Sequence, residues 1–239
     1  MCHSDASRPP AAPGAVPAAS DGPLELQGAD GTRVLAHEAR PTTPSGVGIV
    51  ILPDVRGLHD YYRQLAVRFA ETGAQAVAVD YFGRTADSDD RSEAFGFRPH
   101  VDAATQEGIA ADVAAGVAQL RERGATRIFT VGFCLGGGMS WRQSADTEGL
   151  SGCIGFYGRP ALATDAVDRM ATPLLMLIAG ADANLPLADS EALAAAAGAQ
   201  VPVELVVFDG APHSFFDRSF AEHEADCARA WDEMLRFVS

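Results

Sequence analysis

One short stretch of the chain carries residues that could do nucleophilic chemistry. Residues 132–137 read GFCLGG, which fits the pattern Gly-x-nucleophile-x-Gly with Cys134 as the nucleophile. In this motif the nucleophile sits on a sharp strand-to-helix turn, and the glycines permit the close packing that the turn requires. The helix N-terminus would stabilise a thiolate, and the Leu135 N–H would be one oxyanion donor. An unreactive cysteine in a glycine-rich turn is the alternative.

Two histidines follow Cys134, and proteins built around this motif have the order nucleophile, acid, histidine. His213 lies in the loop after the apolar run Val203–Phe208, at the carboxyl end of a late predicted strand, where a base can reach the cysteine. His223 falls on the polar face of the predicted final helix. We therefore predict His213 as the general base, with a loop histidine bonded to backbone as the alternative.

The acid that orients the base should follow the strand before that one. The apolar run 174–178 leads into Asp182, which we expect to accept a hydrogen bond from His213 and to support the imidazolium. Two other carboxylates compete for this role. Asp189 is expected near a helix start, where carboxylates cap N–H groups, and Asp209 lies close to the histidine in sequence.

A second oxyanion donor should come from the loop after an early strand. The run Val47–Leu52 is apolar throughout, as in a strand that is buried on both faces, and the loop 53–58 follows it. The Val55 N–H is the predicted donor. His59 lies close to this loop, and we expect it to serve at a helix start or on the surface.

The elements that position these residues alternate between buried strands and amphipathic helices. A predicted hairpin turns at residues 29–31, and further strands are expected near 47–52, 76–79, 127–131, 153–157, 174–178 and 203–208. Helical spacing of apolar residues separates them. This order predicts one α/β domain, with a mostly parallel central sheet and helices on both faces. The polar, irregular segment 81–100 is expected to border a site.

The chain divides into a short arm and one domain. Residues 1–22 are rich in alanine and proline, so we expect a flexible N-terminal arm before a domain that spans residues 23–239. Cys2 and His3 offer too few ligands on this arm to indicate a metal site. Cys153 and Cys227 fall on predicted buried faces. The spacing of the four cysteines fits no disulfide framework, so free thiols in a reducing compartment are expected.

Composition excludes several classes of function. The formal net charge of -14 disfavours nucleic acid and anionic membranes as partners. No apolar run is long enough to span a bilayer and no secretory signal is recognisable, so we expect a cytoplasmic protein. All 18 basic residues are arginines. Without lysine, Schiff-base chemistry, pyridoxal-phosphate attachment and a Walker-type nucleotide site are excluded.

Taken together, these residues resemble the dienelactone hydrolase family of α/β-hydrolases, from about residue 24 to the C-terminus. The resemblance rests on the cysteine motif at 132–137, the turn at 180–182, and the sequences PDVRGL at 53–58, DYFGR at 80–84 and PHSF at 212–215. In that family a Cys–His–Asp triad opens cyclic enol lactones and related esters. The resemblance implies the same chemistry here, through a thioester and with no metal or cofactor.

The resemblance also indicates auxiliary residues. Family members place a glutamate after the first parallel strand to help ionise the cysteine, and here Asp54 stands there with a shorter side chain, as an auxiliary acid or as a structural aspartate. Family arginines hold the substrate carboxylate, for which Arg91 and Arg84 are candidates. The family's second arginine lies just after the histidine, where Asp217 precedes Arg218 here. These departures weaken the case for dienelactone itself.

Two hypotheses of different class follow. The first is a cysteine hydrolase of small esters or lactones, monomeric or homodimeric, in which Cys134, His213 and Asp182 form the triad. The second is a non-catalytic small-molecule binding protein on a hydrolase scaffold, because a fold does not determine a function. The retained nucleophile, base and acid favour the hydrolase, since a binding protein needs none of the three together.

Overall fold

The computed structural model describes residues 4–217 and 220–239. Eight strands form one sheet: β1 (Ser20–Gln27), β2 (Arg33–Arg40), β3 (Val47–Leu52), β4 (Gln75–Asp80), β5 (Arg127–Phe133), β6 (Gly152–Phe156), β7 (Leu174–Ala179) and β8 (Val203–Phe208). Their order is β1-β2-β4-β3-β5-β6-β7-β8. Strand β2 pairs antiparallel with both β1 and β4, and all other pairs are parallel. The predicted mostly parallel sheet is confirmed.

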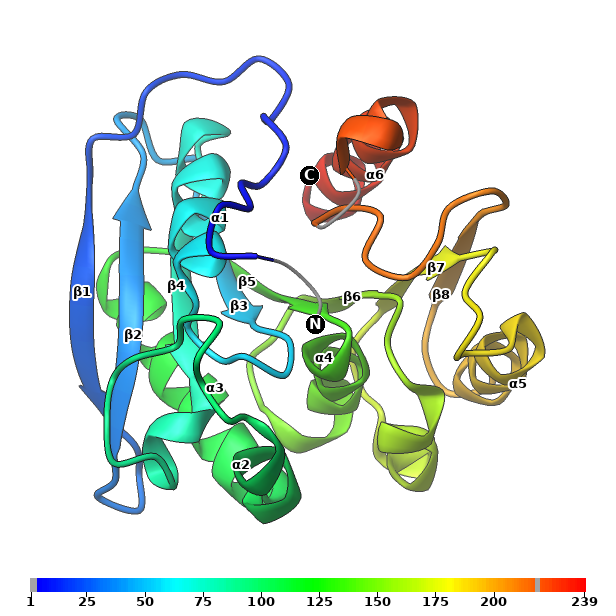
Figure 1. Ribbon diagram of the computed structural model, residues 1–239, viewed down its shortest axis with the longest axis horizontal. Helices are drawn as coiled ribbons and strands as arrows, with labels where there is room; N and C mark the ends of the chain where they lie inside the picture. Colours follow the sequence, from blue (N-terminus) through cyan, green and yellow to red (C-terminus); the bar gives the residue numbers. More distant parts are fainter. Residues whose placement is uncertain (1–3, 218–219) are drawn as a thin grey trace.

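Helices cover both faces of this sheet (Figure 1). The α-helices are α1 (Asp60–Glu71), α2 (Arg98–Ala103), α3 (Gln106–Glu122), α4 (Leu135–Asp146), α5 (Leu187–Ala197) and α6 (Glu224–Val238). Short 3₁₀ helices are η1 (Tyr81–Arg84), η2 (Pro160–Leu162), η3 (Thr164–Arg169) and η4 (Phe220–Glu222). Within the described ranges, no helix is long and apolar enough to cross a membrane.

Strand β3 explains why the sheet needs two helical layers. Its six residues are all buried, and their side chains alternate between two separate hydrophobic cores. Ile49 and Ile51 pack in the core that includes α1 and α6, whereas Val50 and Leu52 pack in the core beneath α3 and α4. The alternation follows from the period of two residues along a strand, so both faces of an apolar strand must be covered.

The N-terminal segment lies against α1 in the described part of the chain (Figure 1). Ala12 is buried, and the Val16 N–H donates to the Glu71 carbonyl oxygen over 2.9 Å. Strand β1 begins at Ser20, inside the segment predicted as an arm. The mobility of residues 1–22 stays a prediction, and Cys2 and His3 lie outside the described residues.

The segment after β4 is mostly irregular, as predicted, but it also contains two short helices, η1 and α2. Helix α2 was not expected, because only six residues form it and none of them is buried. His59 serves at the start of α1, where its Nδ1 accepts a hydrogen bond from the Tyr61 N–H. This agrees with the helix-start use that the sequence indicated.

Candidate active site

Cys134 occupies the sharp turn between β5 and α4. Its backbone has φ 53° and ψ -110°, a conformation that non-glycine residues rarely adopt and that stores strain. The flanking glycines make this turn possible. A Cβ on Gly132 would overlap the Gly136 carbonyl group, and a Cβ on Gly136 would overlap the Leu52 carbonyl oxygen. The local sequence therefore determines both the turn and the exposure of the cysteine at its tip.

The partly exposed Cys134 lines a cavity of about 520 Å³ together with Val55, Leu135, Tyr157 and His213. A cavity of this volume suits a small organic molecule. The two residues predicted as oxyanion donors, Val55 and Leu135, thus border the same space as the cysteine and the histidine. Leu135 is the first residue of α4, so its N–H belongs to the positive end of the helix dipole.

His213 and Asp182 form a close polar contact. The His213 Nδ1 lies 2.6 Å from the Asp182 Oδ2, and the Asp182 side chain is 2% exposed. The other carboxylate oxygen, Oδ1, accepts hydrogen bonds from the backbone N–H groups of Asn184 at 2.9 Å and Leu185 at 3.3 Å. Because Nδ1 contacts the carboxylate, proton transfer to and from a substrate would take place at Nε2.

The competing residues lie elsewhere. Asp189 is exposed in the first turn of α5, and Asp209 is exposed after β8. His223 lies at the N-cap of α6, where its Nδ1 is 3.2 Å from the Asp226 carboxylate. Among the described histidines and carboxylates, only the pair predicted from the sequence joins the strand ends of β7 and β8 beside Cys134.

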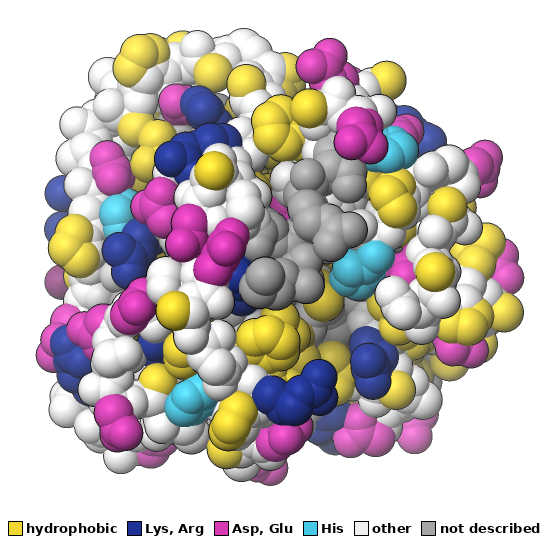
Figure 2. Space-filling view, viewed as in Figure 1, with side chains coloured by type: hydrophobic (Ala, Val, Ile, Leu, Met, Phe, Trp, Pro, Cys, Tyr) yellow, Lys and Arg dark blue, Asp and Glu magenta, His cyan; other side chains and the backbone are white. Residues whose placement is uncertain are grey.

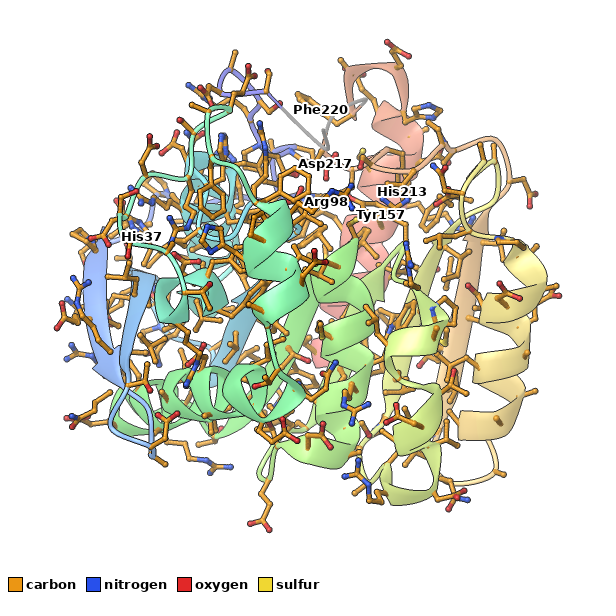
Figure 3. The ribbon with its side chains drawn as sticks, turned by 60° about the horizontal axis from the view of Figure 1, so that its bottom comes forward. His37, Arg98, Tyr157, His213, Asp217 and Phe220 are labelled. Carbon is orange, nitrogen blue, oxygen red and sulfur yellow. The ribbon has the colours of Figure 1, made fainter. Side chains whose placement is uncertain are left out.

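Tyr157 is a residue of the cavity that the sequence reasoning missed. Its ring centroid lies 4.9 Å from that of His213, and its hydroxyl donates to the Asp217 Oδ2 over 3.1 Å (Figure 3). Tyr157 also has φ 35°, a second strained residue at a strand end. Asp217 is 1% exposed, so the tyrosine hydroxyl binds a carboxylate that is buried in the protein. Arg218 lies outside the described residues.

Asp54 is fully buried in the loop after β3. Its Oδ1 accepts a hydrogen bond from the Arg56 N–H over 2.9 Å, and its carbonyl oxygen accepts one from the Tyr81 hydroxyl over 3.1 Å. These contacts shape the loop that carries Val55. Asp54 is not among the residues that line the cavity, so its predicted role as an auxiliary acid stays a prediction.

The structure does not bring Arg84 or Arg91 into the cavity. The Arg84 guanidinium lies 2.6 Å from the carboxylates of both Asp112 and Asp30. Arg91 pairs with Asp80 over 2.8 Å, and both side chains are 1% exposed. Burial raises the pKa of Asp80, although the adjacent Arg91 guanidinium opposes the shift. Both arginines therefore hold the fold together in the described structure.

Two other arginines line the cavity, and the sequence reasoning missed both. Arg98 begins α2 and Arg159 follows β6; both are exposed. Among residues 4–217 and 220–239, neither guanidinium has a hydrogen bond or an ion pair. In the lower half of the face in Figure 2, basic side chains lie beside hydrophobic ones. Arg159 could have been predicted from its position just beyond the end of a parallel strand, because ligands bind at the carboxyl ends of such strands.

The two other cysteines of the described structure are buried. Burial raises the pKa of the Cys153 thiol to about 11 and that of Cys227 to about 12. Both are therefore protonated at neutral pH and inert as nucleophiles. Cys134 differs from them because it is partly exposed and borders a cavity.

Comparison with known proteins gives one family. The model of the dienelactone hydrolase family matches residues 34–239. A protein of Saccharolobus solfataricus named "Putative carboxymethylenebutenolidase" is 23% identical over 245 residues, which cover 87% of this chain and 95% of that protein. A Bradyrhizobium protein named "Probable 2-oxo-3-(5-oxofuran-2-ylidene)propanoate lactonase" is 26% identical over 230 residues, covering 88% of this chain and 91% of that one.

Solved structures share the fold. A Klebsiella pneumoniae protein described as "Putative Dienelactone Hydrolase" superposes with a TM-score of 0.76 and 24% sequence identity, covering 92% of this chain and 98% of that one. An esterase of Pyrococcus furiosus gives a TM-score of 0.69 with 14% identity, covering 92% of this chain and 94% of the esterase. At these identities the likeness concerns the fold alone.

Proposed function

Because the chain belongs to the dienelactone hydrolase family, we propose that it hydrolyses small esters or lactones, as a carboxymethylenebutenolidase does, with Cys134 as the nucleophile. One observation carries the proposal. Cys134 stands on a strained turn in the same cavity as His213, whose Nδ1 is 2.6 Å from a buried carboxylate. This arrangement supports a nucleophile, a base and an orienting acid in their usual roles.

In the first half of the reaction, the Cys134 thiolate attacks the carbonyl carbon and forms a C–S bond. The N–H groups of Leu135 and Val55 stabilise the oxyanion. The tetrahedral intermediate then collapses, the bond to the leaving oxygen breaks, and His213 supplies a proton to that oxygen where it needs one. An enolate is a good leaving group, so enol lactones suit a thiol nucleophile better than simple alkyl esters do.

In the second half, His213 takes a proton from water as the water attacks the thioester. The C–S bond breaks, the carboxylic acid product forms and the thiolate returns. The imidazolium gives its proton to the leaving oxygen in the first half and is restored when His213 takes the proton of water in the second. Asp182 stabilises this imidazolium and holds Nδ1, so that Nε2 is the nitrogen that exchanges protons. No step needs a metal or a cofactor.

The substrate carries a carboxylate in this proposal. Arg98 and Arg159 support it, because two guanidinium groups without protein partners in the described chain border a cavity in a protein of formal charge -14. A guanidinium can grip a carboxylate with two parallel hydrogen bonds. We assign this role to Arg98 and Arg159 in place of Arg84 and Arg91, whose guanidinium groups are held by aspartates.

The test compares wild type and Cys134→Ala on a dienelactone and on p-nitrophenyl acetate. We expect wild type to hydrolyse both, with the carboxylated lactone preferred, and Cys134→Ala to hydrolyse neither. Hydrolysis that survives in Cys134→Ala would overturn the cysteine mechanism. If wild type hydrolyses neither compound and Cys134 reacts with iodoacetamide no faster than a free thiol, the protein is instead a binding protein on this scaffold.

A further inference from the structure

A second cavity opens beside the first and has no part in the mechanism above. Its volume is about 590 Å³, and it lies between η2, η3 and α5. Three residues line both cavities: Arg159, Asn184 and Leu185. The two spaces therefore adjoin along these residues, and a molecule that is bound at Cys134 can extend past Leu185 into the second cavity.

The second cavity is lined mainly by apolar groups. Helix α5 presents alanines to it, and their small side chains leave the space open. Besides Leu185, the apolar lining residues are Pro160, Ala161, Pro186, Ala192, Leu193 and Ala196. An apolar group that enters this cavity leaves water, which is favourable in proportion to the area it buries.

Asp182 connects the base to the loop between the two cavities. One of its oxygens binds the His213 Nδ1, and the other binds the N–H groups of Asn184 and Leu185. The loop that separates the two cavities is thus tied to the same carboxylate that orients the base. The leaving oxygen must lie beside His213 to receive its proton, and His213 lines the first cavity together with Asn184 and Leu185, so the group attached to that oxygen can extend past these two residues.

We propose that the second cavity is a subsite for the leaving-group side of the substrate. The preferred substrates are then esters and lactones that carry an extended apolar substituent on the carbon bonded to the leaving oxygen. The proposal rests on the proposed hydrolase function and adds the class of substituent to it. The carboxylate lies near Arg98 and Arg159, and the apolar substituent fills the space along α5.

The test uses 4-alkylphenyl acetates with alkyl groups from methyl to pentyl. The acidity of the leaving phenol is nearly constant across this series, so only the length of the apolar substituent changes. For wild type we expect kcat/KM to rise about fourfold for each fully buried methylene and about twofold for a half-buried one. The gain should appear mainly as a lower KM, because the subsite binds ground state and transition state alike.

Helix α5 offers a matched pair of variants. Ala192 and Ala195 are both exposed on this helix, but only Ala192 lines the cavity. We expect Ala192→Phe to fill the cavity and abolish the rise of kcat/KM with chain length. We expect Ala195→Phe to keep the wild-type rise.

Two results would overturn the subsite. One is a wild-type kcat/KM that does not depend on chain length, and the other is the same chain-length dependence in Ala192→Phe as in wild type. Failure of the hydrolase function itself looks different, since even 4-methylphenyl acetate would then show no hydrolysis that depends on Cys134. Binding of 4-pentylphenol to Cys134→Ala by calorimetry tests the cavity without turnover, and binding no tighter than that of 4-methylphenol also overturns the proposal.

Discussion

The Cys134 side of the first cavity is built from loops at the ends of β5, β7 and β8, whereas the Arg98 side is built from the segment between β4 and α3. On the Cys134 side, backbone geometry determines where each group lies. Glycines without room for a Cβ enforce the turn, and Asp182 binds both a histidine and two backbone N–H groups.

On the Arg98 side, side-chain pairing decides which groups face the cavity. Three arginines occur within 15 residues of sequence, and two of them, Arg84 and Arg91, are bound by aspartates. Arg98 is left exposed at the cavity. The difference suggests that the chemical step depends on the strand ends, whereas substrate choice depends on which arginines the aspartates leave available. Three substitutions test this division.

The largest effect is expected for Asp182→Asn on the Cys134 side. The variant loses the charge that stabilises the imidazolium and favours the wrong tautomer of His213, so kcat/KM should fall about 10³- to 10⁴-fold. Steady-state hydrolysis of the dienelactone measures it. Asp209→Asn is the control, because Asp209 is an exposed carboxylate after β8 that lines neither cavity, and it should stay within twofold of wild type. If kcat/KM falls less than tenfold in Asp182→Asn, Asp182 is not the acid that orients His213.

A loss of stability is expected for Arg91→Gln on the Arg98 side. Asp80 would remain buried without its cation, which lowers the free energy of unfolding by about 3–5 kcal/mol. Chemical denaturation measures it, with Arg98→Gln as the control, since substitution of an exposed side chain without a partner changes stability by less than about 0.5 kcal/mol.

The pH dependence of Arg91→Gln sharpens the same test. The pKa of Asp80 is raised in the folded protein from its ordinary 3.8, and removal of the cation raises it further. The folded variant therefore holds this proton more tightly than the unfolded chain does. Its free energy of unfolding should recover in acid and fall as the pH rises above about 4. A deficit that does not change with pH would show that Asp80 is not its cause.

The smallest effect is expected for Arg98→Gln, and it concerns selectivity. For the carboxylated lactone, kcat/KM should fall about tenfold. This is the loss expected for one charge-assisted hydrogen bond, reduced because the Arg98 side chain is exposed to solvent. For the methyl ester of the same lactone, kcat/KM should not change. Arg33→Gln serves as the control, because Arg33 is an exposed arginine of β2 outside the cavity. Equal losses on the acid and the ester would remove Arg98 from carboxylate recognition.

The sequence predicted the parts of the site that depend on the order of apolar runs and on the positions of glycines. The alternation of apolar runs predicted the parallel sheet, and the glycines around Cys134 predicted a strand-to-helix turn, since no other residue fits there. Asp182 and His213 could be placed because each follows a strand whose carboxyl end meets that turn. The geometry supports these three assignments, and their chemical roles remain to be tested.

The sequence could not predict the arginines of the cavity. The local sequence does not distinguish Arg84, Arg91 and Arg98. They differ in the structure because Asp112 binds Arg84 and Asp80 binds Arg91, and these two aspartates are far apart in sequence. Helix α2 buries none of its residues, so no apolar periodicity predicted it. Tyr157 follows β6 and could have been proposed from its place at a strand end, but its contact with Asp217 depends on tertiary packing.

The double binding of Asp182 has a practical consequence for protein engineering. Asn184 and Leu185 border both cavities and invite randomisation, but their backbone N–H groups bind the carboxylate that holds His213. Libraries that alter this loop would therefore disturb turnover and selectivity together. Positions 192 and 196 contact the same space from a helix that is not bonded to Asp182. Diversity placed on α5 should change the substrate range while the reactive groups keep their alignment.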